Sequence, residues 1–190
     1  DAIKPDAPIL HDFIKFDGKP SNIAGTLEHK KGNIEEGFKD ADIIIEKEFE
    51  TAAVHQGYLE THACLVSVSP DDRTTIWSSS QGQFMVRAMT SFITGIPQSS
   101  IRAIPAEIGG GFGGKTIVYL EPVATILSKK SGRPVKMVMT REEVMRASGP
   151  TSGSKSKVKI GAKNNGKITA AQGTFYLQAG AFPGAPIRGA

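Results

Sequence analysis

The residues with the clearest chemical potential form a glycine-rich stretch in the middle of the chain. Between Glu107 and Thr116 the sequence has five glycines in six positions, interrupted by Phe112. Glycine loses more conformational entropy on folding than any other residue, so a run of this density needs a structural reason. The usual reason is a backbone that turns sharply and offers bare N–H groups to a bound anion. The stretch therefore predicts a ligand cradle.

Two nucleotide-binding patterns fit this stretch. As Gly109-x-x-x-x-Gly114-Lys115-Thr116 it satisfies the P-loop pattern, in which backbone N–H groups and the lysine hold phosphates. As Gly109-x-Gly111-x-x-Gly114 it satisfies the dinucleotide-binding fingerprint. Each pattern needs its own setting of strand, helix and acidic residue, so the flanking sequence tests both.

The flanking sequence suits neither pattern well. The preceding predicted strand contains Arg102 and Pro105, which do not fit the buried centre of a parallel sheet. Pro122 falls where a P-loop helix would be in mid-course. No aspartate follows Asp72, so none can hold magnesium or a ribose hydroxyl after the loop. A P-loop nucleotide-binding module stays the alternative function.

Other polar residues favour different roles. His55, His62 and Cys64 match no common zinc-ligand spacing, so we expect them to be structural members of a strand region. The apolar surroundings of Cys64 disfavour a reactive thiolate. Gln81 stands where a predicted strand passes into a helix, a position from which side chains reach a site beyond strand ends.

The helices and strands predicted around these residues indicate an α+β fold, with helices packed on a mixed, largely antiparallel sheet. The predicted helices cover residues 34–41, 85–93, 121–131 and 140–147. The predicted strands cover residues 42–49, 65–68, 74–80, 100–106, 133–139, 157–162 and 167–177. We expect residues 1–50 to be an irregular lead-in with the start of the domain, and residues 51–190 to be its main part, truncated at the C-terminal end.

One predicted helix carries a broad apolar stripe. Its members recur at helical spacing and are Phe84, Met85, Ala88, Met89, Phe92 and Ile93. We expect this stripe to pack into the core.

Composition narrows the function classes. The net charge of +4 suits an anionic ligand without requiring nucleic acid, and the lysines between residues 155 and 163 lack interleaved aromatic residues for base stacking. No apolar run approaches the length needed to span a membrane. Cys64 is the single cysteine, which is compatible with a reducing compartment, and we expect a cytoplasmic protein.

Several separated segments together resemble the molybdenum-binding subunit of the xanthine dehydrogenase and aldehyde oxidase family of molybdenum hydroxylases. They follow one another in the family's order over nearly the whole chain. These segments are Lys31–Asp42, His55–His62 (with Tyr-Leu-Glu-Thr-His), Ser78–Gln81, Glu107–Lys115, Ser131–Lys136 and Thr140–Glu143. The resemblance implies that the chain is a fragment of an oxidoreductase and that residues 51–190 form the N-terminal part of a molybdopterin-binding domain.

The resemblance also implies roles for particular residues. The cofactor-binding residues would be Gln81, Gly109, Gly110, Gly111, Phe112 and Gly113. Gln81 would lie near the molybdenum without ligating it, and Phe112 and Thr116 would line the substrate pocket. No residue is assigned as the catalytic base, because the family's glutamate base is expected beyond Ala190. Xanthine-oxidising members carry a glutamate where this chain has Thr116, which predicts against xanthine as the substrate.

Activity and partners follow from the same resemblance. The parent enzyme would hydroxylate an aldehyde or an N-heteroaromatic compound, with water as the oxygen source. Iron–sulfur clusters and FAD are expected on other domains or subunits, alongside the remainder of the molybdenum subunit. The fragment alone is expected to be inactive.

Overall fold

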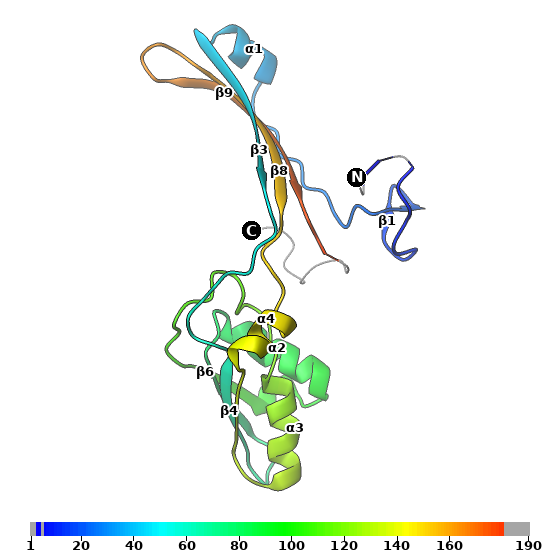
Figure 1. The fold of residues 1–190 in the computed structure, drawn as a ribbon, viewed down its shortest axis with the longest axis vertical. Coiled ribbons are helices and arrows are strands. Elements are labelled where there is room, and N and C mark those ends of the chain that lie inside the picture. The colour runs from blue at the N-terminus through cyan, green and yellow to red at the C-terminus, as the bar shows by residue number, and fades with distance from the viewer. Residues whose placement is uncertain (1–2, 5, 181–190) are drawn as a thin grey trace. The chain divides into compact units, whose positions relative to one another are not determined.

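The computed structural model describes residues 3–4 and 6–180, which fall into two compact units (Figure 1). One unit is formed by Val54–Thr151, and the other by Asp1–Ala53 together with Ser152–Ala190. The boundary near residue 50 that the sequence indicates remains a prediction.

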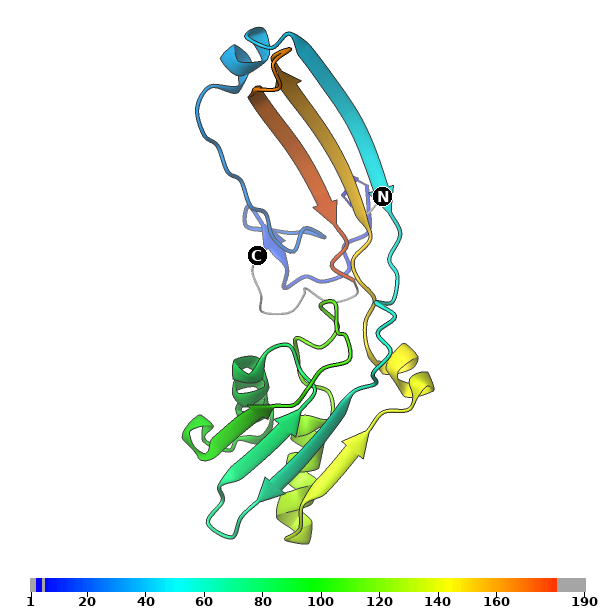
Figure 2. The same ribbon diagram turned by 90° about the vertical axis from the view of Figure 1, so that its left-hand side faces the viewer.

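A four-stranded sheet forms the centre of the 54–151 unit (Figure 2). Its strands are β4 (Ala63–Val68), β5 (Thr74–Ser78), β6 (Ile101–Pro105) and β7 (Val135–Val138), in the order β6-β5-β4-β7. β5 and β6 are parallel, and β4 is antiparallel to both β5 and β7. The sheet is therefore mixed and largely antiparallel, as predicted, with Arg102 and Pro105 on an edge strand.

Two longer helices cover one face of this sheet. α3 (Glu121–Ser131) packs on β4, α2 (Gln83–Thr94) packs on β6, and the two helices contact each other. α4 (Arg141–Ala147) and the short 3-10 helix η1 (Gln98–Ser100) complete the unit. The buried apolar residues between sheet and helices are Cys64, Val66, Ile76, Val86, Ile96, Ile101 and Ala124.

The helix ends follow local sequence signals. Pro122 lies in the first turn of α3, and Gly132 ends that helix in the left-handed conformation at φ 64°. At α4 the Thr140 side chain accepts from the Glu143 N–H, and the Glu143 carboxylate accepts from the Thr140 N–H. This capping box confirms the predicted start of α4.

The prediction that the apolar stripe of α2 packs into the core is wrong. Phe84 is 87% exposed and Phe92 is 83% exposed, while Val86 and Thr90 are fully buried. Val86 and Thr90 are one helical turn apart, and their short side chains let the helix axis approach β6 and α3 closely. Periodicity identified an apolar stripe but not which face of the helix the sheet would take.

The second unit contains a three-stranded antiparallel sheet in the order β3-β8-β9. Its strands are β3 (Ile43–Thr51), β8 (Ser154–Ala162) and β9 (Ile168–Leu177), and Gly166, at φ 88°, turns the predicted β8–β9 hairpin. The short helix α1 (Ile34–Lys39), capped by the Asn33 side chain, packs on β8 and β9. Two-residue strands β1 (Lys15–Phe16) and β2 (Lys19–Pro20) pair in the lead-in, where the sequence predicts no strand.

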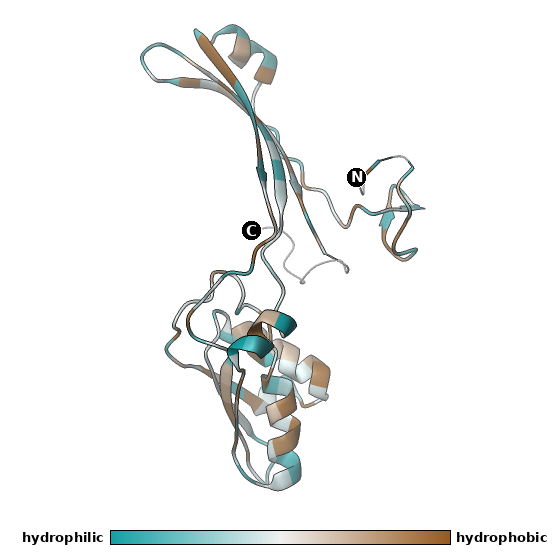
Figure 3. Cartoon of the chain, viewed as in Figure 1, coloured by the Kyte–Doolittle hydropathy of each residue, from teal (hydrophilic) through white to brown (hydrophobic). Residues whose placement is uncertain are grey.

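The three-stranded sheet is apolar at one end of β3 and charged further along (Figure 3). The strand begins with three isoleucines that are about half exposed, Ile43, Ile44 and Ile45. Further along, the Glu46 carboxylate of β3 forms an ion pair with the Lys157 ammonium of β8, with Nζ 2.9 Å from Oε1. None of the described helices is both long and apolar enough to cross a bilayer.

Candidate functional site

The glycine-rich loop and Gln81 meet at one edge of the four-stranded sheet. Gln81 follows β5 and the loop follows β6, and because these strands are parallel their C-terminal ends lie together. The Gln81 Oε1 accepts from the Gly113 N–H at 2.9 Å and from the Lys115 N–H at 3.2 Å. Two segments that the sequence singled out separately are therefore joined by one amide oxygen.

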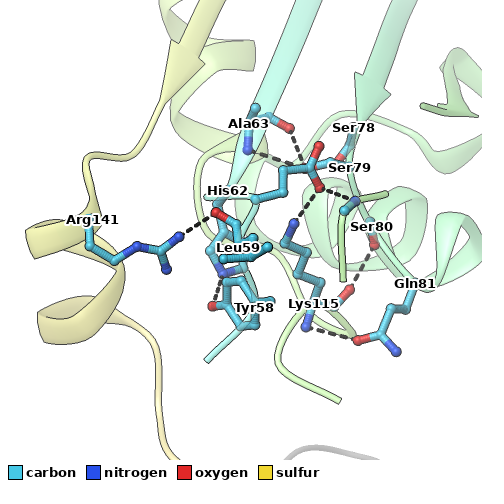
Figure 4. Close-up of polar contacts among 12 residues, drawn as sticks. Tyr58, Leu59, His62, Ala63, Ser78, Ser79, Ser80, Gln81, Lys115 and Arg141 are labelled. Atoms are coloured by element: carbon cyan, nitrogen blue, oxygen red, sulfur yellow. Dashed lines mark hydrogen bonds and ion pairs between the residues drawn. The ribbon is translucent and has the colours of Figure 1, made fainter. Parts of the chain in front are cut away.

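Further hydrogen bonds to the Lys115 backbone hold the loop against the end of β5. The Gln81 N–H and the Ser80 hydroxyl both donate to the Lys115 carbonyl, at 2.9 and 3.0 Å. Figure 4 shows the Gln81 side chain with its oxygen on the Lys115 backbone and its nitrogen directed away from it. Among the described residues that amide nitrogen has no hydrogen-bond partner. The fixed oxygen thus leaves the NH₂ group as the exposed donor.

The loop needs its glycines for two different reasons. At Gly111 a Cβ atom would lie 2.5 Å from Gln81 Oε1 and 2.8 Å from Gln81 Cδ, closer than real Cβ contacts allow. Gly113 has φ 90°, a conformation that L side chains rarely adopt. Phe112 nevertheless adopts φ 49°, and its side chain is 70% exposed. Phe112 therefore holds a backbone conformation that is costly for a non-glycine residue, as residues in ligand-binding loops often do.

The middle of the loop keeps free donors, because the bonds that fix it lie at its two ends. The N–H of Gly109 is bound to Glu60, and the N–H groups of Gly113, Gly114 and Lys115 are bound within the loop or to Gln81. Among the described residues, the N–H groups of residues 110–112 have no acceptor. Consecutive backbone N–H groups without an acceptor are the kind of donors that hold oxygen ligands in anion-binding loops.

Lys115 lies beneath the loop, where its charge is paired. Its side chain has no exposed surface, and Nζ lies 2.5 Å from Glu60 Oε2 and 5.1 Å from the Tyr58 ring centroid. Glu60 Oε2 also accepts from the Gly109 N–H at 2.9 Å. Burial alone would raise the pKa of the Glu60 carboxyl, but the hydrogen bonds from Lys115 and Gly109 hold that pKa below its ordinary value.

The structure does not support the P-loop alternative. A P-loop lysine must reach bound phosphates, but the Lys115 ammonium is buried against Glu60 and Tyr58. A P-loop helix also starts at its lysine, whereas α3 starts at Glu121.

A hydrogen-bonded network supports the segment next to Glu60. The Tyr58 hydroxyl lies 2.7 Å from His62 Nε2 and 3.2 Å from Ser148 Oγ, and His55 Nε2 lies 3.0 Å from the same serine oxygen. The His62 ring packs against Tyr119 with the ring centroids 4.5 Å apart. His55 and His62 therefore have protein partners in a polar network behind the loop.

Burial sets the protonation of two groups in this unit. Burial, followed by the positive charge of Lys115, lowers the pKa of His62 to about 4, so the ring is neutral near pH 7. Burial, followed by the nearby Glu121 carboxylate, raises the pKa of the Cys64 thiol to about 12. Neutral Cys64 is thus a packed core side chain rather than a nucleophile.

Three glutamates near the loop can be compared as proton acceptors. Glu60 is held by Lys115 and Gly109, and Glu121 is buried with its oxygens bound to the Ser78 hydroxyl and the Tyr119 N–H. Glu107 is exposed ahead of the glycines. None has the setting of a catalytic base, and the glutamate expected beyond Ala190 lies outside the described residues.

The comparisons with known proteins agree with the predicted resemblance. Residues 15–188 match the molybdopterin cofactor-binding domain family. The probable hypoxanthine oxidase XdhD of Escherichia coli strain K12 is 34% identical over 161 residues, covering 85% of this chain and 17% of that protein. Aldehyde oxidase 3 of Mus musculus is 32% identical over 184 residues, covering 95% of this chain and 14% of that protein.

Solved structures show the same fold. Reconstituted CO dehydrogenase from Oligotropha carboxidovorans superposes with a TM-score of 0.66 at 30% identity, over 92% of this chain and 23% of that chain. Aldehyde oxidoreductase from Desulfovibrio gigas superposes with a TM-score of 0.70 at 22% identity, over 93% of this chain and 19% of that chain. The α+β fold predicted from the sequence is confirmed.

This chain spans only 14–17% of the length of the two curated relatives named above. The family match nevertheless runs through the loop, Gln81 and Glu60, and through both compact units. The chain belongs to the molybdopterin cofactor-binding domain family found in xanthine dehydrogenases and aldehyde oxidases.

Proposed function

We propose that the loop 109–113 and Gln81 bind the molybdenum cofactor in a molybdenum hydroxylase. The observation that carries this proposal is the row of three N–H groups at residues 110–112 that have no acceptor among the described residues. Gly111 lies against the Gln81 side chain, whose NH₂ group also has no partner among the described residues. Four donors held at one strand end fit the oxygen ligands of a pterin-bound metal and its phosphate.

The residues of this chain would bind and orient the cofactor. Gln81 is fixed through its oxygen, so its nitrogen can donate without first losing rotational freedom. Phe112 would present its exposed ring to the substrate pocket, and Thr116 would line the same pocket. When bound, the molybdenum cofactor supplies the redox chemistry of the enzyme, and the described residues supply the rigid donors around it.

We propose that the full-length protein oxidises an aldehyde or an N-heteroaromatic compound, with water as the oxygen source. The names of the relatives, which include an aldehyde oxidase and a probable hypoxanthine oxidase, support this substrate class. Electrons would leave through iron–sulfur clusters, and possibly FAD, on other domains or subunits. Carbon monoxide dehydrogenase large chain of Hydrogenophaga pseudoflava, 32% identical over 195 residues, bears a name that implies smaller companion chains.

The test of cofactor binding is the metal and pterin content of the full-length protein, purified from its own cells. We expect close to one molybdenum per chain, together with the fluorescence of an oxidised pterin released on denaturation. A folded, intact sample with neither molybdenum nor pterin would contradict the proposal. Titration with magnesium–ATP would then re-examine nucleotide binding.

Thr116 predicts the substrate preference within this class. Its hydroxyl donates to the Gly113 carbonyl at 3.0 Å, so it serves the loop and offers no negative charge to a purine. We expect kcat/KM for an aromatic aldehyde to exceed that for xanthine by about tenfold or more, the loss typical of one missing charged contact. The measurement is parallel steady-state assays of the loaded protein on both compounds. Comparable turnover of xanthine would contradict the role given to Thr116.

A further inference from the structure

One carboxylate oxygen joins the two ends of the glycine loop. Glu60 Oε2 accepts from the Gly109 N–H at 2.9 Å and from Lys115 Nζ at 2.5 Å. The Glu60 N–H also donates to the Gly109 carbonyl at 3.2 Å. Gly109 begins the loop and Lys115 ends it, so the Glu60 side chain closes the segment between them.

Lys115 connects this closure to Gln81. Its backbone N–H donates to Gln81 Oε1, and its carbonyl accepts from the Gln81 N–H and the Ser80 hydroxyl. Lys115 therefore touches Glu60 through its side chain and Gln81 through its backbone (Figure 4). The same residue thus bonds both oxygen atoms that hold the loop, Glu60 Oε2 through its ammonium and Gln81 Oε1 through its backbone N–H.

The Glu60–Lys115 ion pair lies in surroundings where its attraction is only weakly screened. The Lys115 side chain is fully buried and the Glu60 side chain is 34% exposed, so water screens the pair weakly on the lysine side. A buried ammonium without its partner is strongly unfavourable, which ties the position of Lys115 to that of Glu60. The Tyr58 ring, 5.1 Å from Nζ, restricts the ammonium further.

We propose that Glu60 and Lys115 are positioning residues that hold the loop in its binding conformation before the cofactor arrives. This inference rests on the proposed cofactor role of the loop. The pair fixes the loop ends so that the N–H groups of residues 110–112 stay free and the Gln81 nitrogen faces outward. A loop ordered in advance loses little conformational freedom on binding, so the pair raises cofactor affinity without touching the cofactor.

Three variants of the full-length protein test the proposal. E60Q keeps an oxygen for the Gly109 N–H but removes the negative charge, and K115M keeps the length of the side chain but removes the ammonium. The double variant E60Q/K115M removes both charges, so it leaves no unpaired charge buried and is the variant that best keeps the fold. Matched controls break exposed ion pairs of the same unit: E142Q at Glu142–Arg146, and K129M at Asp72–Lys129.

Two readouts are measured on each protein. The first is hydrogen–deuterium exchange of the peptide covering residues 107–116 in protein made without cofactor. The second is the molybdenum and pterin retained by cofactor-loaded protein after prolonged dialysis. We expect about tenfold faster exchange and about tenfold lower retention in all three variants, since each loses a charge-assisted bond, with unchanged exchange of the core strands. Both controls should match the wild type.

The outcomes separate this inference from the proposed function. Normal loop exchange and normal retention in the double variant would overturn the positioning role, even if the single variants misfold. Wild-type protein without molybdenum or pterin would instead overturn the proposed function. In that case the exchange measurement on cofactor-free protein still decides whether Glu60 and Lys115 order the loop.

Discussion

At the scale of single residues, Gly111 is the loop position where a side chain would displace Gln81. A Cβ atom there would lie 2.5 Å from Gln81 Oε1, the atom that receives the Gly113 and Lys115 N–H groups. In G111A the Gln81 side chain must move, so both bonds are lost. We expect the molybdenum and pterin content of the full-length protein to fall about tenfold, and stability to fall by about 1–3 kcal/mol.

The matched control for G111A is G149A. Gly149 has nothing within 4 Å of its ideal Cβ position, so the extra methyl group should be harmless. Cofactor content is measured by metal analysis and pterin fluorescence on equal amounts of folded protein. G111A with wild-type cofactor content would show that Gln81 does not have to hold the loop.

The glycine density and Gln81 were predictable from sequence, whereas the partners of Lys115 were not. A run of glycines and a glutamine at a strand end are local patterns. Lys115 is 55 positions from Glu60, and its local sequence fits a phosphate-binding lysine equally well. Only folding shows that the ammonium is turned inward. The available signal was that Glu60 and Lys115 each lie within a segment of the family resemblance.

At the scale of elements, the sequence predicted the parts whose causes are local. Asn33, the Thr140 capping box, Pro122 with Gly132, and the Gly166 turn all act within a few residues, and each is found at the predicted end of an element. The short β1–β2 hairpin had such a signal in Asp17-Gly18, both at positive φ, and was missed. Strand order depends on contacts far apart in sequence, so the β6-β5-β4-β7 order could not be derived.

The outward-facing stripe of α2 leads to a prediction opposite to the one that the sequence suggests. Val86 is fully buried between α2 and the sheet, so V86A should cost about 1–3 kcal/mol of unfolding free energy. Phe92 is 83% exposed, so F92S should change it by less than about 0.5 kcal/mol. Urea unfolding of this 190-residue chain, followed by the fluorescence of Trp77, its single tryptophan, measures both changes. A larger loss in F92S than in V86A would mean that the phenylalanine face is the packed one.

At the scale of the whole molecule, segments far apart in the sequence contribute to the same compact unit. Asp1–Ala53 and Ser152–Ala190 contribute to one unit, and Val54–Thr151 form the other. The strands β3 and β8 pair across more than a hundred residues of intervening chain, with Thr51 opposite Ser154. Sequence patterns identify each strand but not this pairing. The cost of closing a long intervening segment grows only slowly with its length, so the separation of two strands in the sequence does not show whether they pair. The unit formed by Val54–Thr151 contains the candidate loop, Gln81 and the Glu60–Lys115 pair.

His62 makes the stability of that unit depend on pH. Its pKa is lowered from 6.5 in the unfolded chain to about 4 in the folded one, so the unfolded state takes up a proton first as pH falls. Stability from the neutral ring is complete above pH 6.5 and is lost as pH falls toward 4. Between about pH 7.5 and 5 the loss should be about 2 kcal/mol. Glu60 adds its own loss at lower pH. Because its folded pKa is lowered, that loss begins as pH falls through the ordinary carboxyl pKa of the unfolded chain and continues down to the folded pKa.

The urea midpoint of Trp77 fluorescence at pH 7.5 and at pH 5 measures this loss. In H62Q the amide can still bond the Tyr58 hydroxyl but does not titrate, so its midpoint should be lower at neutral pH and change little by pH 5. H29Q, which replaces an exposed histidine in the other unit, should keep the wild-type dependence. A pH dependence that survives in H62Q would assign the proton uptake to another group, and the neutral ring behind Glu60 would then be no part of the acid sensitivity.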